Sequence, residues 1–113
     1  MRKITLRFSA VDKDDFKEIK DGLKTVETRA ATTRYKDIQK GDILVMVCGK
    51  QKIIKQVKRV RHFKTIESML KAIPLKKIMP SIKSVADARK VYYGYQGYKE
   101  KIKEFGLMAL ELE

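Results

Sequence analysis

The chain is poor in the residues that build disulfides, zinc sites and redox centres. Its 113 residues include one cysteine (Cys48), one histidine (His62), two prolines and no tryptophan. A single cysteine cannot form an internal disulfide, and together with one histidine it leaves no Cys/His cluster that would bind zinc. We therefore expect no metal and no other cofactor, and a reducing, cytoplasmic setting.

Long apolar stretches are also missing. No segment approaches the roughly 20 consecutive apolar residues of a membrane-spanning helix. Near the N-terminus, Arg2, Lys3 and Arg7 interrupt the apolar residues, unlike the apolar core of a signal peptide. The sequence predicts a soluble protein with no membrane partner. Its length and its hydrophobic content of 43% indicate one globular domain, residues 1–113, which we expect to be monomeric.

Acidic residues are scarce relative to basic ones. The chain has 27 Lys and Arg against 14 Asp and Glu, a net charge of +13. No acid occurs from Ile43 to Ile66, a segment that contains seven cations: Lys50, Lys52, Lys55, Lys58, Arg59, Arg61 and Lys64. This asymmetry favours one basic face and a polyanionic partner, RNA or a nucleotide. The alternative is an ordinary charged surface that keeps the protein soluble.

Hydrophobic periodicity predicts the order β-α-β-β-β-α-α-α-β. The expected strands are 3–8, 25–29, 43–48, about 51–63 and 107–113. The first expected helix is capped by Asp12 and ends at Gly22, and the later ones begin at Thr65, Ser84 and Tyr98. Val57 and Val60 are three residues apart, which breaks strict alternation and indicates a bulge. We expect an α+β fold, a small β-barrel of about five or six strands decorated by helices.

The octet from Gly22 to Arg29 carries the most chemistry. Lys24 is expected at the mouth of a turn, with a mobile amine. If Val26 points inward, Thr25, Glu27 and Arg29 share the opposite face and offer a hydroxyl, a carboxylate and a guanidinium to one ligand. Glu27 lies between two cations and should stay ionised. The plainer alternative is an exposed ion pair between Glu27 and Arg29 that contributes little stability.

This octet matches the pattern G-x-K-x-x-E-x-R and resembles the signature of ASCH domains, a branch of the PUA-like barrels. Further features follow in the same order over nearly the whole chain: the Lys40-Gly41-Asp42 turn, the Val57, Arg61 and Phe63 strand, the Pro80 and Ser84 segment, a Tyr-rich helix and the closing strand from Gly106. The chain is similar to the small, single-domain prokaryotic type. The resemblance implies a PUA-like barrel whose cleft is floored by the signature and walled by the intervening helices.

The resemblance also implies a role in binding RNA, or in processing RNA or nucleosides. ASCH amidohydrolases that act on acetylated cytidine use a Lys and a Thr of this octet and a distal Glu in the helical insertion. Here Lys24 matches the Lys, Glu27 stands at the Thr position, and no acid lies between Ser68 and Ala86. The leading hypothesis is therefore an RNA- or nucleotide-binding module. A hydrolase of RNA phosphodiesters or modified nucleosides, with Lys24 and Glu27 as catalytic residues, is the first alternative, and a protein-interaction domain is the second.

Several side chains beyond the octet are candidates for ligand contacts. Arg34 and Tyr35 follow the octet directly, and Tyr93 and Tyr98 lie among cations, where rings can stack on bases. Tyr92 and Tyr95 fall on an apolar helix face and are expected in the core. The predicted ligand-binding set is Lys24, Thr25, Glu27, Arg29, Arg34, Tyr35, Arg61, Lys64, Tyr93 and Tyr98.

Overall fold

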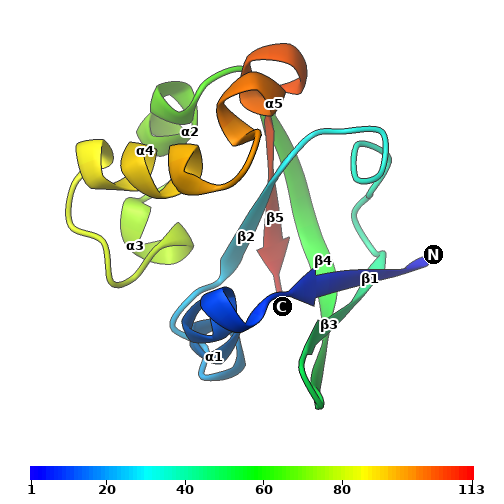
Figure 1. Ribbon diagram of the computed structural model, residues 1–113. Coiled ribbons are helices and arrows are strands. Elements are labelled where there is room, and N and C mark those ends of the chain that lie inside the picture. Colours follow the sequence, from blue (N-terminus) through cyan, green and yellow to red (C-terminus); the bar gives the residue numbers. More distant parts are fainter.

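A five-stranded sheet forms the centre of the protein. The computed structural model describes all residues from 1 to 113. The strands are β1 (Lys3–Phe8), β2 (Val26–Ala30), β3 (Ile43–Cys48), β4 (Gln51–Phe63) and β5 (Leu107–Leu112). Their order is β1-β3-β4-β5-β2, with β1 and β3 parallel and all other neighbours antiparallel. The sheet curls into a half-barrel whose two edge strands are β1 and β2 (Figure 1).

Helices fill the connections between the strands. They are the 3₁₀-helix η1 (Ala10–Asp12), α1 (Lys13–Lys20), α2 (Ile66–Ala72), α3 (Leu75–Ile78), α4 (Val85–Gly94) and α5 (Tyr98–Phe105). The predicted α+β fold is confirmed, with η1 and α3 in addition to the predicted elements. The predicted Thr65 cap is confirmed, whereas the Asp12 side chain makes no capping bond to α1. No helix in the structure is both long enough and apolar enough to cross a bilayer.

Two hydrophobic cores lie on opposite faces of the sheet. On β5, Met108, Leu110 and Leu112 point into the half-barrel, where Phe16 and Ile19 of α1 cover them. Leu107 and Ala109 alternate with them and face the layer formed by α2 to α5. Strand β2 pairs with β5 along its whole length and is likewise covered on both faces. Strand β2, which contains the second half of the octet, is therefore buried on both faces, although it pairs with a neighbouring strand on one side only.

Strand β4 bends where the sheet passes from the β3 side to the β5 side. Its pairing register with β5 shifts between Val57 and Arg59. The bulge that we predicted from the spacing of Val57 and Val60 is thus confirmed. Because a bulge sharpens the local twist, it lets one 13-residue strand serve both halves of the curled sheet.

The end of α1 determines where the octet begins. Gly22 has φ +79°, and its N–H donates to the Ile19 carbonyl while the Leu23 N–H donates to the Glu18 carbonyl. This is a Schellman motif, which requires a left-handed residue at the position of Gly22. The Lys24 N–H also donates to the Glu18 carbonyl. The chain therefore reverses tightly, and Lys24 lies directly beside the last turn of α1, two residues before β2.

Candidate functional site

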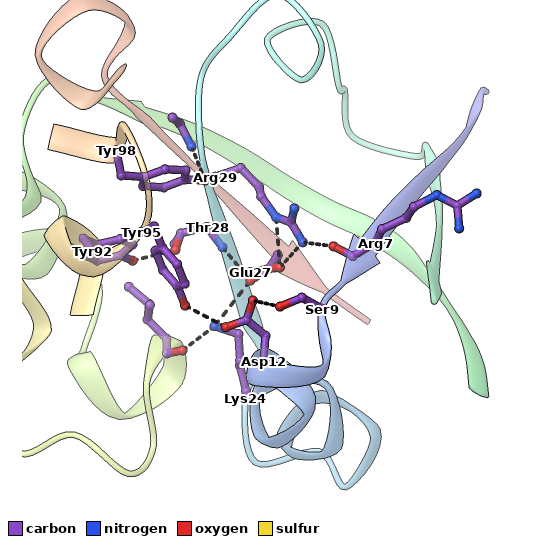
Figure 2. A network of polar contacts seen from close by, with 12 residues as sticks. Arg7, Ser9, Asp12, Lys24, Glu27, Thr28, Arg29, Tyr92, Tyr95 and Tyr98 are labelled. Carbon is purple, nitrogen blue, oxygen red and sulfur yellow. Dashed lines mark hydrogen bonds and ion pairs between the residues drawn. The ribbon is translucent and has the colours of Figure 1, made fainter. Parts of the chain in front are cut away.

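A pocket of about 180 Å³ lies at the seam between β1 and β2. Strand β2 supplies one side, β1 and η1–α1 supply another, and the segment joining α4 to α5 supplies a third (Figure 2). The lining residues are Arg7, Phe8, Asp12, Asp15, Lys24, Glu27, Thr28, Arg29, Met79, Tyr92, Tyr95, Gln96 and Tyr98. Four of these residues belong to the octet, so the octet does line a cavity bordered by helices.

Lys24 is held rigidly at the base of the pocket. Its side chain is 3% exposed, and Nζ donates to the Ile78 carbonyl at 2.6 Å. Nζ also lies 3.4 Å from Oε1 of Glu27. The expectation of a mobile amine is wrong, because the tight turn after α1 and the α3 backbone enclose the ammonium. Nζ thus has one hydrogen bond and one ion pair within the protein, which leaves at least one N–H for a ligand.

Glu27 links the cations of the octet. Its Oε2 accepts from Nε and Nη2 of Arg29 at 3.2 and 3.1 Å, and its Oε1 accepts from the Thr28 N–H at 3.1 Å. Burial alone would raise the pKa of Glu27. Lys24, Arg29 and these hydrogen bonds outweigh burial and hold the pKa below its ordinary value. The carboxyl therefore stays ionised, as the sequence indicated, and serves as a fixed acceptor for its neighbours.

Arg29 bridges the open seam of the half-barrel. Its guanidinium lies 5.0 Å from the Phe8 ring centre and 5.6 Å from that of Tyr35. Nη2 reaches the Arg7 carbonyl on β1 at 3.5 Å. One side chain from β2 thus contacts the opposite edge strand, and its position closes one side of the pocket (Figure 2).

Both faces of β2 are covered by the rest of the protein, unlike those of a simple exposed strand. Glu27 and Arg29 pair across from Leu110 and Met108 and face the half-barrel interior, while Val26 faces the helical layer. Glu27 is 5% exposed, so an exposed ion pair does not describe it. Thr25 precedes the strand, is exposed and does not line the pocket.

Tyrosines form the wall that faces β2. The hydroxyls of Tyr92 and Thr28 share a hydrogen bond of 2.5 Å, and the Ala30 N–H donates to the Tyr98 hydroxyl at 3.3 Å. The Tyr95 hydroxyl donates across the pocket to Oδ1 of Asp12 at 3.3 Å. Tyr92 is a core residue as predicted. The same prediction for Tyr95 is wrong, because α4 ends at Gly94 and releases the ring into the pocket.

Asp15 is a site residue that sequence reasoning missed. It lies in the first turn of α1, lines the pocket, and accepts no hydrogen bond from the protein. Burial raises its pKa, and the nearby carboxylates of Glu27, Asp12 and Glu18 raise it further, whereas Lys24 acts in the opposite direction. The only sequence signal was the three-residue spacing of Asp12 and Asp15, which is also typical of acids at a helix N-terminus.

The pocket has a different charge from the rest of the protein. Figure 2 shows the Arg7 side chain pointing away from the pocket, so that residue contributes mainly backbone. The charged groups that remain are Lys24 and Arg29 against Asp12, Asp15 and Glu27, two cations and three carboxylates. A chain of net charge +13 therefore encloses a pocket that is slightly acidic.

The other predicted ligand contacts lie outside the pocket lining. Tyr35 packs beneath Arg29, and Arg34 lies 5.5 Å from the Tyr35 ring, one side chain away from the pocket. Three more lie farther along the chain: Arg61 near Glu111, Lys64 on the surface, and Tyr93 beside Lys99. Strand β4, which bears Arg61, lies in the middle of the sheet, away from the seam between its two edges. RNA contacts by these residues stay predictions.

Metal ligands are not gathered at the pocket. No three His, Cys, Asp or Glu side chains in the chain are arranged to hold a metal ion. The absence of a metal or other cofactor remains the expectation from sequence.

One family model and two solved structures are similar to the chain. The family model described as "ASCH domain" matches residues 10–113. The crystal structure of hypothetical protein PH0355, a Pyrococcus protein, is 26% identical with a TM-score of 0.85, covering 100% of this chain and 98% of that one. The solution NMR structure of protein PF0455 from Pyrococcus furiosus is 26% identical with a TM-score of 0.74, covering 97% and 96%. No curated protein matches the chain.

Proposed function

This chain belongs to the ASCH domain family, and we propose that its pocket binds a single nucleobase, of RNA or of a free nucleotide, while the phosphates stay outside. The observation that carries this proposal is the slightly acidic pocket inside a basic protein. A phosphate placed in the pocket would lie among Asp12, Asp15 and Glu27, where like charges repel it. An uncharged ring meets no such repulsion.

The size and walls of the pocket suit one ring system. Its volume of about 180 Å³ equals that of about six water molecules in the liquid, well below that of pockets for larger ligands. Tyr95 and Tyr98 line it and contact each other edge to face, with ring centres 5.3 Å apart. Aromatic rings are common partners for bases, and each stacked base contributes about 1–3 kcal/mol.

The free polar groups of the pocket suit the edge of a base. Lys24 has at least one N–H without a protein partner, and Asp15 has an unused carboxyl. The first donates to a carbonyl or ring nitrogen, and the second accepts from an amino or imino group. Glu27 and Arg29 form an ion pair with each other and support Lys24 and Asp15 from the side away from the ligand.

Cations at the rim supply the phosphate contacts. Lys101 lies 5.9 Å from the Tyr98 ring centre, Arg34 lies beside Tyr35, and the Arg7 side chain leaves the seam outward. Each phosphate neutralised by such a residue on a single strand contributes about −0.7 to the slope of log affinity against log salt. The proposal therefore assigns base contacts to the pocket and salt-dependent contacts to its surroundings.

Binding of short RNAs and of free nucleosides at 100 mM salt tests this proposal. Asp15→Asn should change the ranking of the four nucleosides and weaken the preferred one about tenfold, because a charged acceptor becomes a neutral amide. Asp14→Asn is the matched control, since Asp14 is exposed on the same helical turn. Competition by inorganic phosphate as strong as that by the preferred nucleoside, or no RNA binding at this salt concentration, would contradict the proposal.

A hydrolase acting on a modified nucleoside or an RNA phosphodiester is the second candidate. The observation in its favour is that Asp15 reaches the same pocket as Lys24 and the Thr28 hydroxyl. An acid that the helical insertion lacks is thus supplied by α1, and its raised pKa suits proton exchange with a substrate. Product analysis over acetylated nucleosides and short RNAs separates the candidates. Turnover that Asp15→Asn abolishes while nucleoside binding persists supports the enzyme, whereas binding without turnover supports the module.

A further inference from the structure

The half-barrel has an outer face that no helix covers. It is made of alternate residues on three adjacent strands, in the cross-strand rows Lys3–Ile43–Gln56, Thr5–Val45–Ile54 and Arg7–Val47–Lys52. We call these nine residues the β1–β3–β4 outer face. The intervening residues Leu6, Leu44 and Met46 point into the half-barrel and are fully buried. The strand pairing therefore assigns every side chain of this region to one face.

The outer face is open to solvent along β1 and at Ile54 and Lys52 of β4, and partly open along β3. Ile54 is 63% exposed, whereas Ile43, Val45 and Val47 are half-buried and belong to neither hydrophobic core. Helices α2 to α5 gather at β2 and β5 (Figure 1), and α1 packs through Phe16 and Ile19 on the core of the half-barrel interior. The face thus differs from the outer face of β5, which those helices cover.

The chemistry of the face is an aliphatic ridge between cationic flanks. Ile43, Val45 and Val47 form a row along β3, and Ile54 of β4 lies directly beside Val45. Lys3 and Arg7 flank this ridge on β1, and Lys52 flanks it on β4. None of the nine residues is acidic. Contiguous apolar surface that solvent reaches marks interaction sites on soluble proteins, and Ile54 is the most exposed part of this ridge.

We propose that the β1–β3–β4 outer face docks an amphipathic helix of a partner protein, with an apolar stripe against Ile43, Val45 and Val47 and acidic residues on both sides. Alternate residues on a strand are about 6.6–6.8 Å apart, and residues four apart on a helix rise by about 6 Å. A helix laid along β3 therefore presents apolar side chains at nearly the spacing of the ridge. Its flanking carboxylates meet Lys3 and Arg7 on one side and Lys52 on the other.

Charge and composition favour an acidic partner helix over a second copy of the chain and over single-stranded nucleic acid. A second copy of the chain would bring the same cations against Lys3, Arg7 and Lys52, which disfavours self-association through this face. Single-stranded nucleic acid gains its contacts from aromatic stacking as well as from cations. The nine residues include no aromatic side chain.

A synthetic helical peptide tests the proposal with the full-length protein. The peptide is about 12 residues long, with leucines every fourth position and glutamates on both flanks, and the matched control peptide replaces the glutamates by lysines. In NMR titrations the acidic peptide should shift the amides of β1, β3 and the first half of β4, and the basic peptide should not. Ile54→Asp should weaken binding about tenfold or more, because it removes an apolar side chain from the contact. Lys52→Glu should weaken it several-fold, whereas Lys83→Glu, an exposed lysine between α3 and α4, should not.

Three outcomes of these titrations would overturn the proposal. Equal shifts with both peptides, no binding up to millimolar peptide, or binding that Ile54→Asp leaves unchanged would each refute it. Short RNA or anionic lipid vesicles that shift the same amides more strongly than the acidic peptide would assign the face to those ligands instead. Thermal unfolding of each variant confirms that the fold is intact. Ile54 and Lys52 do not line the pocket, so the effect of these two variants separates this face from the pocket, although Arg7 borders both.

Discussion

Replacing Glu27 by glutamine removes the carboxylate that lies between the Lys24 ammonium and the Arg29 guanidinium. The side chains of Lys24 and Glu27 are 3% and 6% exposed, so water cannot take over the lost contacts. The amide keeps one oxygen that can accept from the Thr28 N–H or from Lys24, and it brings an NH₂ group toward the cations. The variant therefore leaves two positive groups close together around a neutral side chain.

The size of the effect follows from this burial. Removing one partner of a buried ion pair costs about 3–5 kcal/mol of unfolding free energy. Arg29 is 16% exposed and keeps its contacts with Phe8 and Tyr35, so we expect the lower end, about 3 kcal/mol. For a domain of this length, that loss lowers the melting temperature by roughly 10–15 °C.

The effect also depends on pH in a defined direction. The folded state holds the pKa of Glu27 below its ordinary value of 4.5, so the carboxylate stabilises the protein fully above that value. As the pH falls below 4.5, the unfolded chain binds this proton before the folded protein does, so the contribution declines and is lost as the pH falls through the lowered pKa of the folded state. The difference in stability between wild type and Glu27→Gln should therefore be largest near pH 7 and shrink toward pH 3.

Urea unfolding followed by circular dichroism measures both the loss of unfolding free energy and its dependence on pH. Glu111→Gln is the control, because Glu111 is 26% exposed beside Arg59 and Arg61 and its loss should cost less than about 1 kcal/mol. Adding Lys24→Met to Glu27→Gln should recover part of the loss, since it removes the uncompensated ammonium. A Glu27→Gln variant within 0.5 kcal/mol of wild type at pH 7, about the size of a surface substitution, would refute the reasoning.

Two further variants test the fold around the site. Gly106→Ala should cost at least about 3 kcal/mol, because Gly106 has φ +75° and ψ −168°, and an added Cβ would lie 2.5 Å from the Phe63 carbonyl oxygen. Gly94→Ala, with open space around the added methyl, should be neutral or slightly stabilising in the same thermal unfolding assay. Thr28→Val should cost about 1–3 kcal/mol by leaving the buried Tyr92 hydroxyl without its partner. Adding Tyr92→Phe should then restore stability, and a double variant that is less stable than Thr28→Val alone would contradict this role of the hydrogen bond.

The regular elements were predictable because their signals are local. Alternation located the strands, Thr65 and Pro74 bounded α2, and the spacing of Val57 and Val60 located the bulge in β4. Helix α3 was missed, because a four-residue segment has too few residues to show a period. Closure of the sheet was not predictable from any one strand, since it depends on which edges remain unpaired.

The chemistry of the octet was predictable only in part. Alternation correctly separated Val26 from Glu27 and Arg29, but it does not tell whether the second face is covered. Lys24 is immobile because α3, more than 50 residues later, places the Ile78 carbonyl against it. Asp15 enters the pocket through the packing of α1 against the half-barrel, and Tyr95 through the end of α4. Such long-range placements leave no mark on local sequence patterns.

The open seam between β1 and β2 has a consequence for self-assembly. Both edge strands carry backbone groups without sheet partners, and an unpaired edge is a template for joining the strands of a second molecule. Arg29 opposes this route, because its guanidinium donates to the Arg7 carbonyl on β1 and places a charge beside that edge. We therefore expect Arg29 to protect the curled, incompletely closed sheet from edge-to-edge association, whatever ligand the pocket takes.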